Sequence, residues 1–382
     1  MKRILLAACA ASAALAAQAQ EKGWEVGAVL DVAHTTRKLA LGQRDQGAAL
    51  GHSDVILRGP LGSHFSAQLG AAAHQHEGKV DFEMEEMWLQ TRTLPGGFQA
   101  RAGRFLSQIG YLNEQHPHAD DFVERPLLYR AFLGGHWFDD GLRLNWTAPT
   151  PFYLTLGAEV FRGRQLIEKA ASSRSPGAMT LSMKVGNDLG ASHSWQLGAA
   201  YLRNRREAAL ADAHEEEGHE HEEDHEATGH DDHHGHAHGA ALSGKKMWLV
   251  DAAWKWAPDG NNRQQQLKLI AEYARVTEPN RYAARSDYHE AASLSAVWRF
   301  SQHWEAGVRT DWLNARMPHG DHFHDARLRE HAVMIAWKPT HQQVLRLQYS
   351  TQPRAEEFEG RSNRTVQLQY VLSFGAHGAH SF

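Results

Sequence analysis

The sequence has almost no cysteine and no long apolar run after its first twenty residues. The one cysteine among 382 residues is Cys9, so a mature chain that begins beyond it cannot be stabilised by disulfide bonds. No later segment approaches the roughly 18 consecutive apolar residues of a transmembrane helix, and the mean hydropathy is −0.55. These absences exclude a helical membrane protein and a disulfide framework.

A basic excess and recognisable catalytic motifs are also missing. The chain has 40 Lys and Arg against 45 Asp and Glu, a net charge of −5, which argues against a nucleic-acid partner. The sequence contains no glycine-rich phosphate loop, no zinc-protease helix motif, and no serine within a known nucleophile motif. We therefore expect no enzymatic activity and no required cofactor.

The first nineteen residues have the organisation of a secretory signal peptide. A basic start at Met1-Lys2-Arg3 is followed by an apolar run from Ile4 to Ala17, and Ala17-Gln18-Ala19 is a small-x-small cleavage pattern. A lipoprotein box ending at Cys9 is the alternative, although it would leave a short apolar core. The mature chain is expected to begin at residue 20.

Short windows along the mature chain alternate apolar and polar residues. In one of them Leu142, Leu144 and Trp146 alternate with Arg143 and Asn145, and similar windows recur to the end of the chain. This period of two predicts strands with one apolar and one polar face. About sixteen such windows predict an all-β fold, a transmembrane antiparallel β-barrel over 20–382 in the lipid of the bacterial outer membrane. A soluble sandwich or large soluble barrel is the alternative.

Connections of two lengths alternate between these windows. Short periplasmic turns and long extracellular loops are typical of bacterial barrels, so both termini are expected in the periplasm. Tight turns are expected at 59–62, 94–97, 149–151, 301–302 and 339–340, and longer segments at 35–52, 107–139, 163–176, 204–245, 278–287, 314–328 and 352–363. Tryptophans near predicted strand ends would form aromatic girdles: Trp24, Trp146, Trp256, Trp304 and Trp337.

The segment 107–138 is rich in aromatic and apolar residues, which is unusual for a loop in water. We expect it to fold into the barrel as a constriction, with an extracellular loop folded on itself as the alternative. Its candidate pore-lining residues are His116, His118, Asp120, Asp121, Glu124, Arg125 and Arg130. Charges of both signs on the predicted inner wall give no expected preference for anions or cations.

The loop 204–245 contains a dense tract of histidine and acidic residues. Imidazole and carboxylate ligands without thiolates favour Zn²⁺, with nickel or copper as alternatives, and so many similar ligands suggest several weak, exchangeable sites. A solvated acidic loop is the alternative. The candidate ligands are His214, His219, His221, His225, His230, His233, His234, His236 and His238, with His319, His322 and His324 as a second cluster.

The predicted strand arrangement resembles that of the phosphate-selective porin O/P type of outer-membrane channel. The same resemblance extends to one stretch before a long loop, Arg101-Ala102-Gly103-Arg104-Phe105-Leu106. The constriction lysines that this resemblance implies are absent from 107–138, so phosphate selectivity is not expected. The resemblance makes a homotrimer an open expectation. The last residue, Phe382, resembles the terminal aromatic that the barrel-assembly machinery recognises in such proteins.

The His-rich loop is similar to those of outer-membrane zinc receptors that depend on an energised inner-membrane partner. Those receptors combine a plug with a barrel of about 22 strands, and this chain is too short for both. The sequence therefore predicts a porin for passive passage of ions and small solutes, linked to zinc or another divalent metal. A non-conducting surface metal-binding barrel and a general or anion-selective porin with an incidental His tract are the alternatives.

Overall fold

The computed structural model describes residues 23–76, 78–92, 94–167, 170–172, 174–208, 239–319, 322–358 and 362–375. The predicted signal peptide, its lipoprotein alternative and the terminal Phe382 lie outside the described residues.

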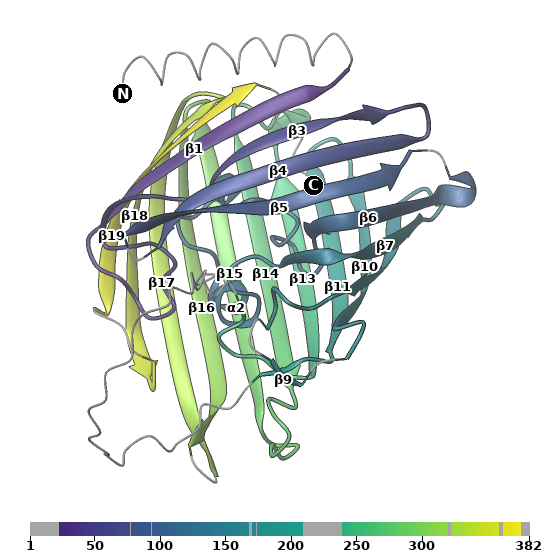
Figure 1. Ribbon diagram of the computed structural model, residues 1–382. Coiled ribbons are helices and arrows are strands. Elements are labelled where there is room, and N and C mark those ends of the chain that lie inside the picture. Colours follow the sequence, from purple (N-terminus) through teal and green to yellow (C-terminus); the bar gives the residue numbers. More distant parts are fainter. Residues whose placement is uncertain are drawn as a thin grey trace, which may run out of the picture.

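The strands form a closed antiparallel barrel (Figure 1). Closure is made by β1 and β19, which pair from Gly27 with Gly375 to Thr35 with Gln367. Segments β2 and β3 both pair with β1 and are separated only by Gly51 and His52, so they act as one spanning strand. Counted in this way, the described residues give sixteen strands, which confirms the predicted fold class.

The barrel strands have the following bounds: β1 Glu25–Thr35, β2 Gly47–Leu50, β3 Ser53–Leu61, β4 Phe65–His76, β5 Lys79–Thr91, β6 Phe98–Leu106, β7 Phe138–Thr147, β8 Tyr153–Phe161, β10 Ala178–Leu189, β11 His193–Asn204, β13 Lys246–Trp256, β14 Gln266–Thr277, β15 Tyr288–Ser301, β16 Trp304–His319, β17 His322–Thr340, β18 Gln343–Glu356 and β19 Arg364–Gly375. The remaining elements are a separate two-stranded sheet of β9 (Ala170–Ser172) and β12 (Glu207–Ala208), the helix α2 (Leu127–Phe132), and the short 3₁₀ turns η1 (Pro95–Gly97), η2 (Pro117–Ala119) and η3 (Pro258–Gly260).

The two faces of the strands differ as the period of two predicts. Leu142 in β7 is 58% exposed on the outside, while its neighbour Arg143 is 5% exposed and points inward. The same contrast holds in β16 between Val308 and Arg309, and in other strands around the barrel. A closed barrel with an outward apolar surface satisfies every strand edge and can sit in a bilayer.

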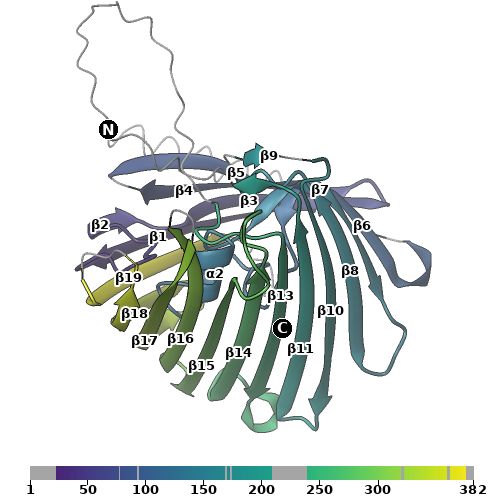
Figure 2. The ribbon, with the colours of Figure 1, turned by 90° about the horizontal axis from the view of Figure 1, so that it is seen from below.

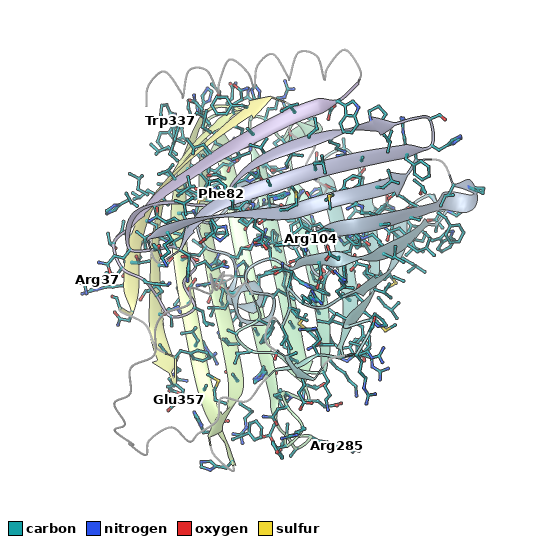
Figure 3. All side chains as sticks on the ribbon, in the orientation of Figure 1. Arg37, Phe82, Arg104, Arg285, Trp337 and Glu357 are labelled. Atoms are coloured by element: carbon teal, nitrogen blue, oxygen red, sulfur yellow. The ribbon has the colours of Figure 1, made fainter. Side chains whose placement is uncertain are left out.

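Short turns and longer connections lie at opposite ends of the barrel. Figure 3 shows Trp337 near the end with the short turns, and Arg285 and Glu357 at the other. The rings of Trp304 and Trp337 lie 6.4 Å apart on neighbouring strands at the short-turn end. Among the described residues, none of the helices is long and apolar enough to cross a membrane.

Several predicted loop boundaries were wrong. Residues 314–319 and 322–328, predicted as a loop, belong to β16 and β17, which pair as far as His319 with His322. Strand β18 extends to Glu356, and β3 extends through Pro60 to Leu61. Beyond the bilayer both faces of a strand meet water, so the alternation that marks a strand in the sequence disappears there.

Candidate functional site

The connection between β6 and β7, residues 107–137, lies inside the barrel, and we call it the inner loop. Figure 2, seen from below relative to Figure 1, shows its helix α2 within the ring of strands. The helix packs against β14, β15 and β16. All six of its residues are buried, because the wall covers part of the helix and other inner-loop residues such as Ile109 and Trp137 pack in the same cluster.

Apolar packing holds the inner loop in this position. Leu127, Leu128 and Phe132 of α2 share one buried cluster with wall residues such as Leu313 and Leu328. Burying a large apolar side chain stabilises the fold by about 1.5 to 3 kcal/mol. This segment therefore folds into the barrel and does not stay in the water outside it.

Carboxylates add specific anchors between α2 and the wall. Arg130 Nη2 donates to Glu330 Oε1 at 2.6 Å, and Arg309 Nη2 donates to the same oxygen at 2.8 Å. Tyr129 Oη donates to Glu272 Oε1 at 2.5 Å. These buried donors and acceptors satisfy each other, as they must in a low-dielectric interior.

A second anchor lies at Glu114 of the inner loop. Its carboxylate lies 2.7 Å from Lys184 Nζ in β10 and 3.4 Å from Arg143 Nη1 in β7. Burial alone would raise the pKa of Glu114, but Lys184 and Arg143 outweigh burial and lower the pKa to about 2. Glu114 is therefore ionised at neutral pH.

A cavity of about 1130 Å³ occupies the lumen on the short-turn side of the inner loop, and we call it the vestibule. It extends from loop residues such as Glu114 and Asp121 to the turn residues His303 and His341. Its basic and acidic lining residues are nearly equal in number, eight against seven. The basic ones are Arg58, Arg101, Lys255, Arg263, Lys268, Arg299, Lys338 and Arg346, and the acidic ones are Glu25, Asp54, Glu86, Glu114, Asp120, Asp121 and Glu305.

A compact group of histidines and carboxylates borders the vestibule where the inner loop meets β3 and β5. Its members are His52, Asp54, Glu85, Glu86, His116, His118 and His136, and we call it the histidine cluster. His52 Nε2 lies 3.2 Å from His116 Nδ1 and 3.3 Å from Glu85 Oε2. Burial would lower the pKa of His116, but the neighbouring carboxylates of Glu85 and Glu86 raise that pKa well above its ordinary value.

Two local irregularities aim the wall residues of this cluster inward. The pairing of β4 with β5 shifts between Gly70 and Ala71, so Glu85 is the extra residue of a β-bulge. Because of the bulge, the consecutive residues Glu85 and Glu86 are both buried. In a regular strand, consecutive side chains point to opposite faces. His52 lies in the break between β2 and β3.

The structure places the seven predicted constriction residues on the inner loop inside the barrel. His116 and His118 belong to the histidine cluster and, with Asp120 and Asp121, line the vestibule. Arg125 pairs with Asp120 at 2.7 Å, Asp121 with Lys268 at 2.5 Å, and Glu124 accepts hydrogen bonds from the backbone of Gln43 and Arg44. Whether they set the narrowest part of a pore stays a prediction.

The predicted external metal ligands are not brought together within the described residues. His214, His219, His221, His225, His230, His233, His234, His236 and His238 lie outside the described residues. His319 and His322 are backbone partners in the β16–β17 ladder, and His324 Nε2 lies 3.2 Å from Glu357 Oε2. External metal binding therefore stays a prediction.

Sequence reasoning missed that His52, Asp54, Glu86 and His136 join His116 in one cluster. A histidine next to a glycine at Gly51-His52, and two adjacent glutamates within an alternating strand, were the available signals. Neither signal identifies a cluster without the strand register.

No family model matches the chain. An uncharacterized protein of Aquifex aeolicus (strain VF5) is 27% identical over 369 residues, covering 88% of this chain and 70% of that protein.

Similar solved structures are outer-membrane proteins. OprB of Pseudomonas putida at high pH has a TM-score of 0.56 and 13% identity, and the match covers 94% of this chain and 96% of that one. An anion-selective porin from Comamonas acidovorans has a TM-score of 0.53 and 13% identity, covering 92% and 99%. In-vitro folded OmpT of Vibrio cholerae in its trimer form has a TM-score of 0.53 and 8% identity, also covering 92% and 99%.

At these identities the likeness establishes the fold alone. Together with the closed barrel and its outward apolar surface, it confirms the predicted location in the bacterial outer membrane.

Proposed function

We propose that the chain is a porin through which ions and small hydrophilic solutes pass without an energy source. The observation that carries this proposal is the vestibule, a cavity of about 1130 Å³ inside a transmembrane barrel and lined by charged side chains. A barrel of 16 to 18 strands leaves room for an aqueous channel. The porin structures that share the fold support this function.

We further propose that divalent metal ions are a relevant cargo. The His-rich segment 204–245 follows β11 at the end of the barrel opposite the short turns, where it would raise the local concentration of zinc or a similar ion beside the mouth. Weak, exchangeable sites suit delivery better than one tight site, because a tightly held ion would not move on.

The nearly equal numbers of basic and acidic residues in the vestibule favour weak charge selectivity. A general or anion-selective porin with an incidental His tract is therefore the second candidate. The Comamonas acidovorans porin of similar fold is described as anion-selective, and basic residues outnumber acidic ones in the vestibule here by only eight to seven.

Conductance of the refolded mature protein in a planar bilayer tests the proposal. Zinc is titrated on the side of the long loops, and the measurement is repeated after deleting His214 to His238. A matched control replaces that segment with a Gly/Ser segment of the same length, which separates loss of histidine from loss of the loop.

We expect open channels whose current or selectivity responds to zinc only while the histidines are present. Open channels with no response to zinc would overturn the metal proposal and leave the general or anion-selective porin. No conductance at any voltage would overturn the porin itself and leave a surface metal-binding barrel sealed by the inner loop.

A further inference from the structure

We infer that the histidine cluster is a binding site for one divalent transition-metal ion of the zinc class, held between the inner loop and the barrel wall by His52, Asp54, Glu85 and His116. The site lies inside the lumen and shares no residue with the His-rich outer segment. Metal binding there does not require that the channel conducts.

The distances between donor atoms fit one face of a tetrahedral site. Zinc binds imidazole nitrogen and carboxylate oxygen at about 2.0 to 2.2 Å, so neighbouring ligand atoms of a tetrahedral ion lie about 3.3 to 3.6 Å apart. His52 Nε2, His116 Nδ1 and Glu85 Oε2 are separated by 3.2, 3.3 and 3.6 Å. Three atoms from three separate segments therefore already have the spacing that a single ion imposes.

Asp54 supplies the fourth ligand. Its Oδ2 lies 3.4 Å from His116 Nδ1 and 3.7 Å from His52 Nε2. His118 Nδ1 lies 3.2 Å from the same oxygen, next to the proposed coordination sphere.

Unsatisfied polar atoms point to the same ion. Both carboxylate oxygens of Asp54, Oε2 of Glu85 and Nδ1 of His118 are buried and make no hydrogen bond within the described residues. Buried polar atoms are rarely left without a partner. A metal ion among these atoms would bind the carboxylate oxygens of Asp54 and Glu85 that no hydrogen bond satisfies.

The outer contacts are those of metal-bound histidine. His116 directs Nδ1 toward the other ligands and Nε2 toward Glu86 Oε2 at 3.1 Å, and Glu86 Oε1 accepts from Trp88 Nε1 at 3.1 Å. A carboxylate on the second ring nitrogen fixes the tautomer and orientation of a metal ligand. His136 Nε2 contacts Glu85 Oε1 at 3.0 Å and orients that carboxylate in the same way.

The donor set selects the class of ion and the vestibule gives access to it. Two imidazoles suit Zn²⁺, Co²⁺, Ni²⁺ or Cu²⁺, whereas Mg²⁺ and Ca²⁺ prefer sites made of oxygen alone. Asp54, His116 and His118 line the vestibule, so an ion in the lumen reaches the cluster directly. A bound ion would connect the inner loop at His116 to the wall at Glu85.

Cobalt binding tests the site without any measurement of current. Protein lacking His214 to His238 is titrated with Co²⁺, whose visible absorption is strong in tetrahedral sites, and the bound Co²⁺ is then displaced with Zn²⁺. We expect one tetrahedral Co²⁺ per barrel, removed by Zn²⁺. The full mature chain should bind the same one tetrahedral Co²⁺ ion, in addition to the Co²⁺ that its outer histidines bind more weakly.

Matched variants assign the ligands. His52→Gln and His116→Gln should each abolish the tetrahedral spectrum or lower the affinity at least tenfold, and Glu86→Gln should keep one equivalent while lowering the affinity roughly 10- to 100-fold. The control is His303→Gln with His341→Gln, two histidines that line the same vestibule outside the cluster. Each variant is checked for the compact barrel band in unheated SDS gels.

Absence of stoichiometric Co²⁺ binding in a folded barrel would overturn the inference, and so would binding that the His52 and His116 variants leave unchanged. Either result would leave the porin proposal standing. Conversely, a barrel that binds the ion but never conducts would overturn only the porin.

Discussion

Glu330 shows how single residues of the wall hold the inner loop. Its Oε1 accepts from both Arg130 and Arg309, and its Oε2 accepts from Gln352 Nε2 at 2.9 Å. One wall carboxylate thus joins α2 to two strands.

We expect Arg130→Ala to loosen α2 against the wall and to raise single-channel conductance. Removing one partner of a buried ion pair costs about 3 to 5 kcal/mol when the other charge is left alone. Arg309 stays on Glu330, so the loss of stability should fall below that range. Conductance and thermal unfolding measure the two effects.

Arg327→Ala is the control, because Arg327 is exposed in the β16–β17 hairpin. It should change neither quantity. An Arg130→Ala barrel with the conductance and melting temperature of the parent would show that apolar packing alone holds the loop.

Acid should weaken the anchor at Glu114 only at very low pH. The pKa of this carboxyl falls from its ordinary 4.5 to about 2 in the folded barrel because Lys184 and Arg143 outweigh burial. A lowered pKa stabilises the fold above the ordinary value, and the gain is lost as pH falls through the folded value. The difference in stability between the parent and Glu114→Gln should be constant from pH 7 to about 5 and should shrink between about 4.5 and 2.

Thermal melts of both proteins across this range measure that difference. A difference that disappears between pH 7 and 5 would contradict the ion pairs at Glu114.

At the scale of elements, the β5 bulge is an insertion that the sheet tolerates. Glu85 has no partner in β4, while Leu89 is paired on both sides, with Ala67 in β4 and Ala102 in β6. Deleting Glu85 should therefore leave an assembled barrel with regular pairing. Deleting Leu89 should shift part of β5 by one residue, turn its apolar side chains into the lumen and prevent assembly.

The fraction of compact barrel in unheated SDS gels compares the two deletions. Equal loss of assembly would mean that the bulge is required for the barrel and not only for the orientation of Glu85.

The sequence predicts the spanning strands well because alternation reports directly which face of a strand meets lipid. It also predicts an inward position for 107–138, since Leu127, Leu128 and Phe132 would be costly in water. The break at His52 and the bulge at Glu85 were not predictable, because both depend on pairing with distant strands. The histidine cluster depends on these two irregularities, and so it was missed.

At the scale of the whole molecule, the outward apolar surface meets lipid. The loss of folding free energy caused by a new charged side chain on this surface should therefore depend on its depth in the bilayer. Val250 is exposed near the middle of β13, and Leu61 is exposed at the last position of β3. Val250→Arg should cost about 2 to 4 kcal/mol, and Leu61→Arg about 0 to 1 kcal/mol.

Equilibrium unfolding in lipid vesicles gives both values. Equal costs at the two positions would contradict a membrane centred on the middle of the strands.

The long-range anchors of the inner loop also determine an order of assembly. Arg130 and its partner Glu330 are 200 positions apart in the sequence, and Arg346 donates to the backbone of Asp120 across 226 positions. The inner loop is synthesised and exported long before the strands that neutralise its charges. Until β17 arrives Arg130 lacks its wall carboxylate Glu330, and the pairing of β19 with β1 is the late event that encloses the loop.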